Sequence, residues 1–453
     1  MSQPSTMSKR RQSLHGHIQK VVQHLDADSL THRSMTLRAL LQSLSAFGNQ
    51  QLDFFENLYQ GEHSLALSEL YPSEYVLNTT LQQIGFDLDV LVRAYSQRAL
   101  DLGSLTEKDG SQSYLRLADT WTYWALKPVM KWGDSVAAEQ QLVAESTVMT
   151  YFQKSTNVRL IPYAPAVLIG IPFSAIDNAF DLLAIPHEVG HYIYHNGCWR
   201  GQTVETWLDE QLRSANLPEW AFHWAEECFA DVYGCLIAGK HIAESALEMA
   251  STASLDEYFE DDGEHPIPAL RPLIYAAVME KLSGLDQEEV TDFRSQWESL
   301  RGQRPLQERL RVHTPSVSAH KLISQAEIGN ALRQMVAVIL KLPPLCLLAQ
   351  STSRLDQGVW AYSLQEMEAA QLEQAVDTTL PELTTNGNEL VITKDASATP
   401  LSLRKLGVTP HDDLRIELTT TLADSTTEAV KRAFDRAIDF GGWTVKGPIG
   451  KTH

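Results

Sequence analysis

The chain has 453 residues, of which 43% are hydrophobic and 21% are charged. This composition is that of a globular protein and excludes a chain that is disordered throughout. Lys and Arg total 37 while Asp and Glu total 57, so the formal net charge is −20. Such an acidic chain is poorly suited to nucleic-acid phosphates or to an anionic membrane surface. We therefore expect neither a nucleic-acid partner nor a membrane partner.

The N-terminus carries basic residues, but no apolar segment of the kind found in secretory signals follows them. The four cysteines form no CxxC pair, which favours buried free thiols in a reducing compartment. We therefore expect a cytoplasmic protein.

The first third of the chain is predicted to be helical. Between residues 12 and 150, apolar side chains recur at helical spacing and glycine and proline are sparse. The pattern changes near residue 156, where residues 158–163 and 166–171 form short apolar runs interrupted by prolines. These runs predict strands, and the prolines place at least one of them at a sheet edge.

The middle of the chain reads as two long helices followed by a loop. The first runs from about residue 178 to Asn196, with Pro186 either in its first turn or at a kink. Pro218 opens the second, which is predicted to end at Gly239. Residues 261–272 then form a loop rich in acidic residues and proline.

The remaining elements complete the predicted architecture, an α+β fold that is predominantly helical. Further helices are expected at residues 273–284, 288–302, 318–342 and 363–376, strands at 389–393 and 413–422, a linker at 385–388 and a helix at 425–440. The predicted domains are a helical region over residues 1–155, a middle α+β domain over 156–380 and a small β/α domain over 386–453.

The sequence His187-Glu188-Val189-Gly190-His191 carries the chemistry. On a helix, residues four apart share a face, so both imidazoles can reach one metal ion. Zn²⁺ accepts histidine nitrogen at about 2.0–2.1 Å in tetrahedral sites. Glu188 can then serve as general base toward a metal-activated water.

A catalytic zinc site requires a third protein ligand. The second helix offers Glu227 and Asp231, which are four residues apart and share a face. Glu227 is the expected ligand, while Asp231 is expected to accept the outer N–H of a ligand histidine. Asp231 as the direct ligand is the alternative. Glu226 lies on a different face, and His195 is explained as a histidine at a helix C-terminus.

The motif HEVGH followed by ExxxD on a later helix resembles the gluzincin branch of the zincin metallopeptidases. The metzincin pattern fails, because it requires Gly and His where this chain has Tyr194 and Gly197. The resemblance covers residues 160–275 and implies a zincin-like core. It assigns His187, His191 and Glu227 to the zinc ion.

The resemblance also implies roles for flanking segments. Residues 166–171 would be the edge strand that pairs with an extended peptide substrate. His265 and Arg271 would act near the tetrahedral intermediate, and Tyr258 could do the same.

The expected function is hydrolysis of a peptide bond in a protein or peptide substrate. A zinc amidase or deformylase is an alternative, and so is a non-catalytic interaction protein on a zincin scaffold. The segment after about residue 386 is interpreted as a targeting, docking or inhibitory module, and a partner or regulator could dock through it.

Overall fold

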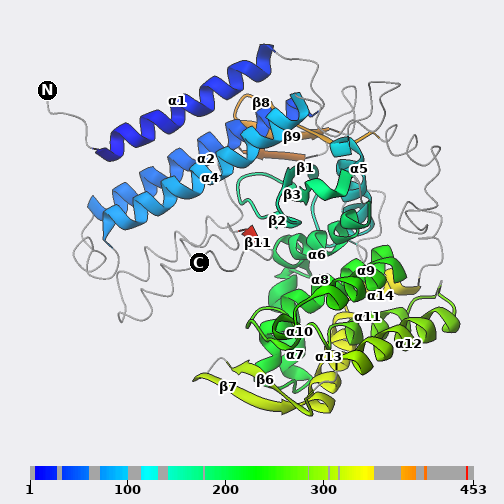
Figure 1. Ribbon diagram of the computed structural model, residues 1–453. Helices are drawn as coiled ribbons and strands as arrows, with labels where there is room; N and C mark the ends of the chain where they lie inside the picture. Colours follow the sequence, from blue (N-terminus) through cyan, green and yellow to red (C-terminus); the bar gives the residue numbers. More distant parts are fainter. Residues whose placement is uncertain are drawn as a thin grey trace, which may run out of the picture.

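The computed structural model describes residues 6–27, 33–60, 72–99, 114–130, 141–176, 179–283, 285–304, 307–314, 317–350, 379–393, 402–405 and 445–446. These residues form a mostly helical structure with a few short strands (Figure 1). The predominantly helical character expected of the fold class is confirmed.

The helices and strands span the following residues. The α-helices are α1 (Thr6–Ala27), α2 (Ser34–Gln60), α4 (Ser73–Ala99), α5 (Tyr114–Leu126), α6 (Ile185–Asn196), α7 (Val204–Ser214), α8 (Ala225–Ala238), α9 (Lys240–Thr252), α10 (Leu255–Phe259), α11 (Pro272–Met279), α12 (Gln287–Gln303), α13 (Gln325–Ile339) and α14 (Pro343–Gln350). Short 3₁₀ helices are η1 (Lys127–Val129), η3 (Phe173–Ile176), η4 (Ala179–Ala184) and η5 (Glu219–Trp224). The strands are β1 (Thr147–Gln153), β2 (Asn157–Arg159), β3 (Ala166–Pro172), β4 (Cys198–Trp199), β5 (Gln202–Thr203), β6 (Arg309–Thr314), β7 (Val317–Ser324), β8 (Glu382–Asn386), β9 (Glu389–Thr393), β10 (Ser402–Lys405) and β11 (Val445–Lys446).

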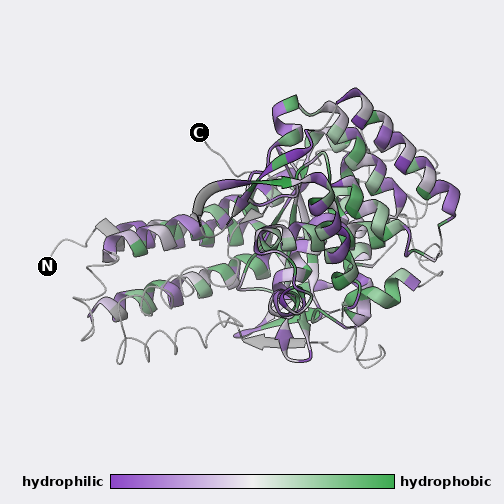
Figure 2. Cartoon of the chain, turned by 90° about the horizontal axis from the view of Figure 1, so that it is seen from below, coloured by the Kyte–Doolittle hydropathy of each residue, from purple (hydrophilic) through white to green (hydrophobic). Residues whose placement is uncertain are grey.

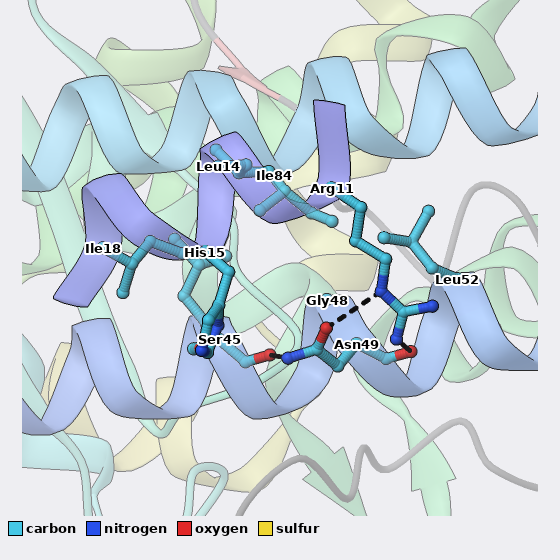
Figure 3. A pocket seen from close by; sticks show the side chains of 10 residues that line it. Arg11, Leu14, His15, Ile18, Ser45, Gly48, Asn49, Leu52 and Ile84 are labelled. Atoms are coloured by element: carbon cyan, nitrogen blue, oxygen red, sulfur yellow. Dashed lines mark hydrogen bonds between the residues drawn. The ribbon is translucent and has the colours of Figure 1, made fainter. Parts of the chain in front are cut away.

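The N-terminal helices α1, α2 and α4 lie side by side at one end of the molecule (Figure 1). Hydrophobic and hydrophilic residues alternate along them, as expected for helices that bury one face (Figure 2). Polar contacts join α1 to α2 around a hollow between them, where Arg11 Nε donates to Asn49 Oδ1 at 3.2 Å (Figure 3).

The central sheet has the strand order β1-β3-β2-β11. β1 runs parallel to β3, whereas β2 is antiparallel to β3. Two sequence predictions are wrong here. β1 is a strand inside the region expected to be helical, and β3 is an interior strand and not an edge strand.

Both faces of this sheet are buried, which explains why β1 was missed. Val148 and Phe152 pack into the apolar core that contains α6 and α8, while Met149 and Tyr151 pack against the N-terminal helices. A strand covered on both faces lacks the alternation of polar and apolar residues that identifies a half-buried strand.

Buried ion pairs attach α4 to the sheet. Arg98 on α4 pairs with Asp119 on α5 at 2.8 Å, and Asp119 also accepts the backbone N–H of Thr150. Arg159 on β2 donates through Nε to Asp87 on α4 at 2.6 Å. These paired charges fix β2 against the N-terminal helices.

The region after α11 departs from the prediction at two places. Residues 317–324 form one arm of the β6–β7 hairpin, so the helix predicted from residue 318 begins only at Gln325. The helix predicted to end at residue 342 ends at Ile339, and Pro343 and Pro344 then begin a further helix, α14, that was not predicted. Proline fits this first turn, because no N–H is needed there.

A second sheet has the order β10-β9-β8. The strand predicted at 389–393 is confirmed, whereas the linker predicted at 385–388 is wrong and forms the β8–β9 turn, with Gly387 at φ 59°. Leu383 and Ile392 join the same apolar cluster as α2. The elements predicted at 363–376, 413–422 and 425–440 lie outside the described residues.

No single helix in the described part of the chain is long and apolar enough to cross a membrane. Helices α13 and α14 reach the length and hydrophobicity of a membrane-spanning helix only when they are taken together, and the pair is bent by 96°.

Helices α6 and α8 pack closely along each other, and small residues make this possible. A Cβ placed on Gly190 would lie 2.7 Å from Ala230 Cα, and one on Gly234 would lie 3.3 Å from His187 N. The two backbones therefore approach too closely for larger side chains at these positions.

Replacing Gly190 with alanine should destabilise the protein by about 1–3 kcal/mol, because α6 and α8 must separate to admit the methyl group. Urea unfolding would measure the loss. Gly85→Ala on α4 is the matched control, since a Cβ there meets nothing within 4 Å. It should be neutral or stabilise by up to about 1 kcal/mol. Equal stabilities for the two variants would contradict the proposed close contact.

Candidate metal centre

The histidines of the motif lie on α6, which begins one residue before Pro186 and ends at Gly197. Pro186 occupies the first turn, as one of the two sequence predictions had it. Helical spacing then puts His187, His191 and His195 on one side of α6. That side faces α8.

Glu227 on α8 completes a group that could hold a metal ion with His187 and His191. The two Nε2 atoms lie 3.1 Å apart. Glu227 Oε2 lies 3.4 Å from His187 Nε2, and Oε1 lies 3.4 Å from His191 Nε2. Tetrahedral ligands at about 2.0–2.1 Å from an ion are separated by about 3.4 Å. The spacing of these three donors therefore fits a tetrahedral metal ion.

Each of the two histidines that could hold an ion has a carboxylate beside its outer nitrogen. Asp231 Oδ1 lies 3.0 Å from His187 Nδ1, which agrees with the role predicted for Asp231. Glu226 Oε1 lies 2.9 Å from His191 Nδ1. The Glu226 carboxylate accepts from His191, so Nδ1 of His191 carries the proton and its Nε2 keeps a lone pair toward the centre.

His195 lies in the last turn of α6, as the sequence predicted, and neither His195 nor Glu226 belongs to the group that could hold an ion. The prediction that Glu226 has no part in the site is wrong, because its carboxylate contacts His191. Glu226 Oε1 also accepts from His195 Nε2 at 2.8 Å, so one carboxylate joins two histidines of α6. Burial would raise the pKa of Glu226, but its hydrogen bonds with His191 and His195 hold that pKa well below its usual range.

Asp231 is fully buried, and its carboxylate is held by Arg271, which directly precedes α11, and by Tyr275 on α11. Arg271 donates to both Asp231 oxygens at 2.7 Å, and the Tyr275 hydroxyl donates to Oδ1 at 2.7 Å. Arg271 Nη2 also reaches Glu227 Oε2 at 3.4 Å. The guanidinium thus balances two carboxylates and orients both.

Glu227 is charged at neutral pH despite its burial. Burial alone would raise its pKa, but His191, His187 and Arg271 lower it to about 2. A deprotonated carboxylate is the form that binds a metal ion.

The Glu188 carboxylate contacts the central sheet. Its Oε2 accepts the backbone N–H of Val158 on β2 at 2.7 Å. Burial is the main reason that the pKa of Glu188 is raised. A raised pKa brings a carboxylate closer to the range in which it can exchange protons near neutrality.

His265 reaches the centre from the loop before α11. Its Nε2 lies 3.3 Å from Glu227 Oε1, and its Nδ1 lies 2.8 Å from Asp262 Oδ2. Tyr258 is buried elsewhere, with the Arg304 guanidinium 5.3 Å from its ring centroid. Of the three residues suggested by the resemblance, His265 and Arg271 contact the metal-ligand group and Tyr258 has no contact with it among those described.

Sequence reasoning missed Glu226, His195, Asp262, Tyr275 and the backbone of Val158. The spacing His191-x-x-x-His195 was an available signal, because it extends the helical face that carries the ligands. The other contacts bridge separate elements, and no local pattern encodes them.

No protein family model, curated protein or solved structure matches this chain. The centre is therefore interpreted from its own geometry.

Replacing Glu226 with alanine should weaken metal affinity by about 10–100-fold, because His191 loses the group that fixes its ring and tautomer. Competition with a chromogenic zinc chelator would measure the dissociation constant. Glu248→Ala, on the exposed face of α9, removes the same charge away from the centre and should leave affinity unchanged. Equal affinities for both variants would exclude the role assigned to Glu226.

Proposed function

We propose that the protein is a zinc-dependent peptidase with a zincin-like core of the gluzincin type. The observation that carries this proposal is the placement of Glu188. It is a buried carboxylate that accepts from Val158 and interacts electrostatically with His191, His187 and Glu227, whose donor atoms have tetrahedral spacing. A structural metal site has no use for such a carboxylate, whereas hydrolysis requires one.

The donor set favours zinc among biological cations. Two imidazoles and one carboxylate suit Zn²⁺ better than Mg²⁺ or Ca²⁺, which prefer oxygen ligands. His187, His191 and Glu227 would hold the ion. When bound, it would polarise the substrate carbonyl and lower the pKa of the attacking water toward neutrality.

Glu188 moves the proton in the proposed reaction. Its carboxylate accepts a proton from the attacking water and then donates it to the leaving nitrogen. The hydrogen bond from Val158 fixes one oxygen, which leaves the other to face the water. Burial keeps bulk water from solvating the charge and raises the pKa of the group.

His265 stabilises the oxyanion as a hydrogen-bond donor. Its Nδ1 is hydrogen-bonded to the Asp262 carboxylate. When the His265 ring is charged, Nε2 also carries a proton, and this N–H is the donor to the oxyanion. Arg271 acts behind the ligands by orienting Asp231 and Glu227.

Extended peptides are the proposed substrates, and the short strand β2 is where they would pair. β2 borders Glu188 through Val158, and the two-residue strand β11 lies on its outer side. Residues 166–171, to which the resemblance gave this role, form β3, which is enclosed by β1 and β2. A zinc amidase or deformylase would use the same residues. Turnover that rises with peptide length favours the peptidase, because strand pairing adds contacts along the backbone.

Glu188→Gln should abolish hydrolysis while the protein retains one zinc per chain, because the amide cannot accept the proton. Digestion of a peptide library, read by mass spectrometry, together with elemental analysis of zinc, would test this. Hydrolysis by Glu188→Gln at the wild-type rate would exclude the general-base role. Absence of zinc from the wild-type protein would refute the metal assignment.

His265→Ala should lower kcat by about 10²–10³-fold with little change in KM or zinc content, because the donor acts on charge that develops in the transition state. Steady-state kinetics on a peptide found in the library would measure it. His17→Ala, on the exposed face of α1, is the control. Loss of zinc along with activity would instead make His265 a structural residue.

A further inference from the structure

The outer edge of β2 lies beside Glu188. The N–H of Val158 donates to Glu188 Oε2 at 2.7 Å, so it points away from β3. In an antiparallel pair, backbone groups of successive residues point alternately toward the partner and away from it. Any strand that pairs with β2 at Val158 on this outer side therefore runs past the proposed general base.

The chain's own C-terminal segment occupies this edge. β11 pairs antiparallel with β2, in a register that sets Val445 opposite Arg159 and Lys446 opposite Val158. Figure 1 shows β11 next to β2, close to α6. Lys446 therefore stands opposite the residue whose N–H holds Glu188.

We propose that β11 is an intramolecular inhibitor that occupies the substrate-binding edge of β2. The inhibitory role rests on the proposed peptidase function, whereas the docking itself does not. β11 adds to the sheet as an extended peptide would, through its backbone. A substrate that pairs with β2 has to displace it.

The surrounding sequence suits a displaceable occupant. Gly441 and Gly442 precede the strand, and Gly447 and Pro448 follow it. As residue types, glycine loses the most conformational entropy in a strand and proline has no N–H to donate to a ladder. A two-residue strand offers few hydrogen bonds, but its covalent attachment gives it a high effective concentration. The segment can thus block weak substrates and yield to a tighter one.

The test breaks the pairing in the full-length chain. Val445→Pro/Lys446→Pro removes both N–H donors of β11. We expect this variant to hydrolyse a short peptide roughly 10-fold faster than the wild type, because freeing a largely occupied site raises the competent fraction. Lys451→Pro/Thr452→Pro places the same two prolines beyond the strand and should match the wild type. Circular dichroism would check that both variants fold.

A binding measurement separates the docking from the chemistry. A fluorescent peptide of residues 441–450 is titrated into Val445→Pro/Lys446→Pro that also carries Glu188→Gln, so that no cleavage occurs. We expect saturable binding by anisotropy, at least about 10-fold tighter than to Glu188→Gln alone, whose edge is occupied. The same peptide with prolines at 445 and 446 should not bind.

The outcomes are distinct. An unchanged hydrolysis rate in the proline variant overturns the inhibitory role and leaves the peptidase standing. If no variant hydrolyses peptides, the proposed function fails, and anisotropy alone decides the docking. Absence of peptide binding to the freed edge overturns the docking in either case.

Discussion

The close contact between α6 and α8 is the constraint on which the candidate site depends. Two histidines on one helix reach an ion only from one side, and the third donor must come from a second backbone at short range. Gly190 against Ala230 and Gly234 against His187 allow that approach. The large apolar core around both helices compresses the contact and holds it in place.

The same contact brings like charges together, which has to be offset. Glu226, Glu227 and Asp231 lie within six residues of α8; Glu227 and Asp231 are buried and Glu226 is partly buried. Carboxylates this close would repel one another and resist ionisation unless cations faced them. Imidazoles of α6 lie beside all three carboxylates, and Arg271 contacts Asp231 and Glu227. The polar network around the metal ligands therefore also makes the helix pair stable.

The sheet connects this centre to regions distant in sequence. Asp87 on α4 holds Arg159, and the neighbouring Val158 holds Glu188. The N-terminal helices thus support the carboxylate to which we assign the proton transfer. The predicted boundary at residue 155 falls between β1 and β2, two strands of one sheet. The β8–β9 hairpin likewise packs on α2 from the other end of the chain.

The sequence by itself determined the local part of this protein. Helical spacing identified the face shared by His187 and His191, and the later ExxxD identified Glu227 and Asp231, because one turn of helix fixes which residues can meet. Tertiary structure alone decided that Glu226 joins His191 to His195, that Val158 holds Glu188 and that β3 is interior. These contacts join separate segments of the chain, and sequence periodicity reports only on residues within one helix or strand. The positions of the segments are set by packing, including that on the two buried faces of the sheet.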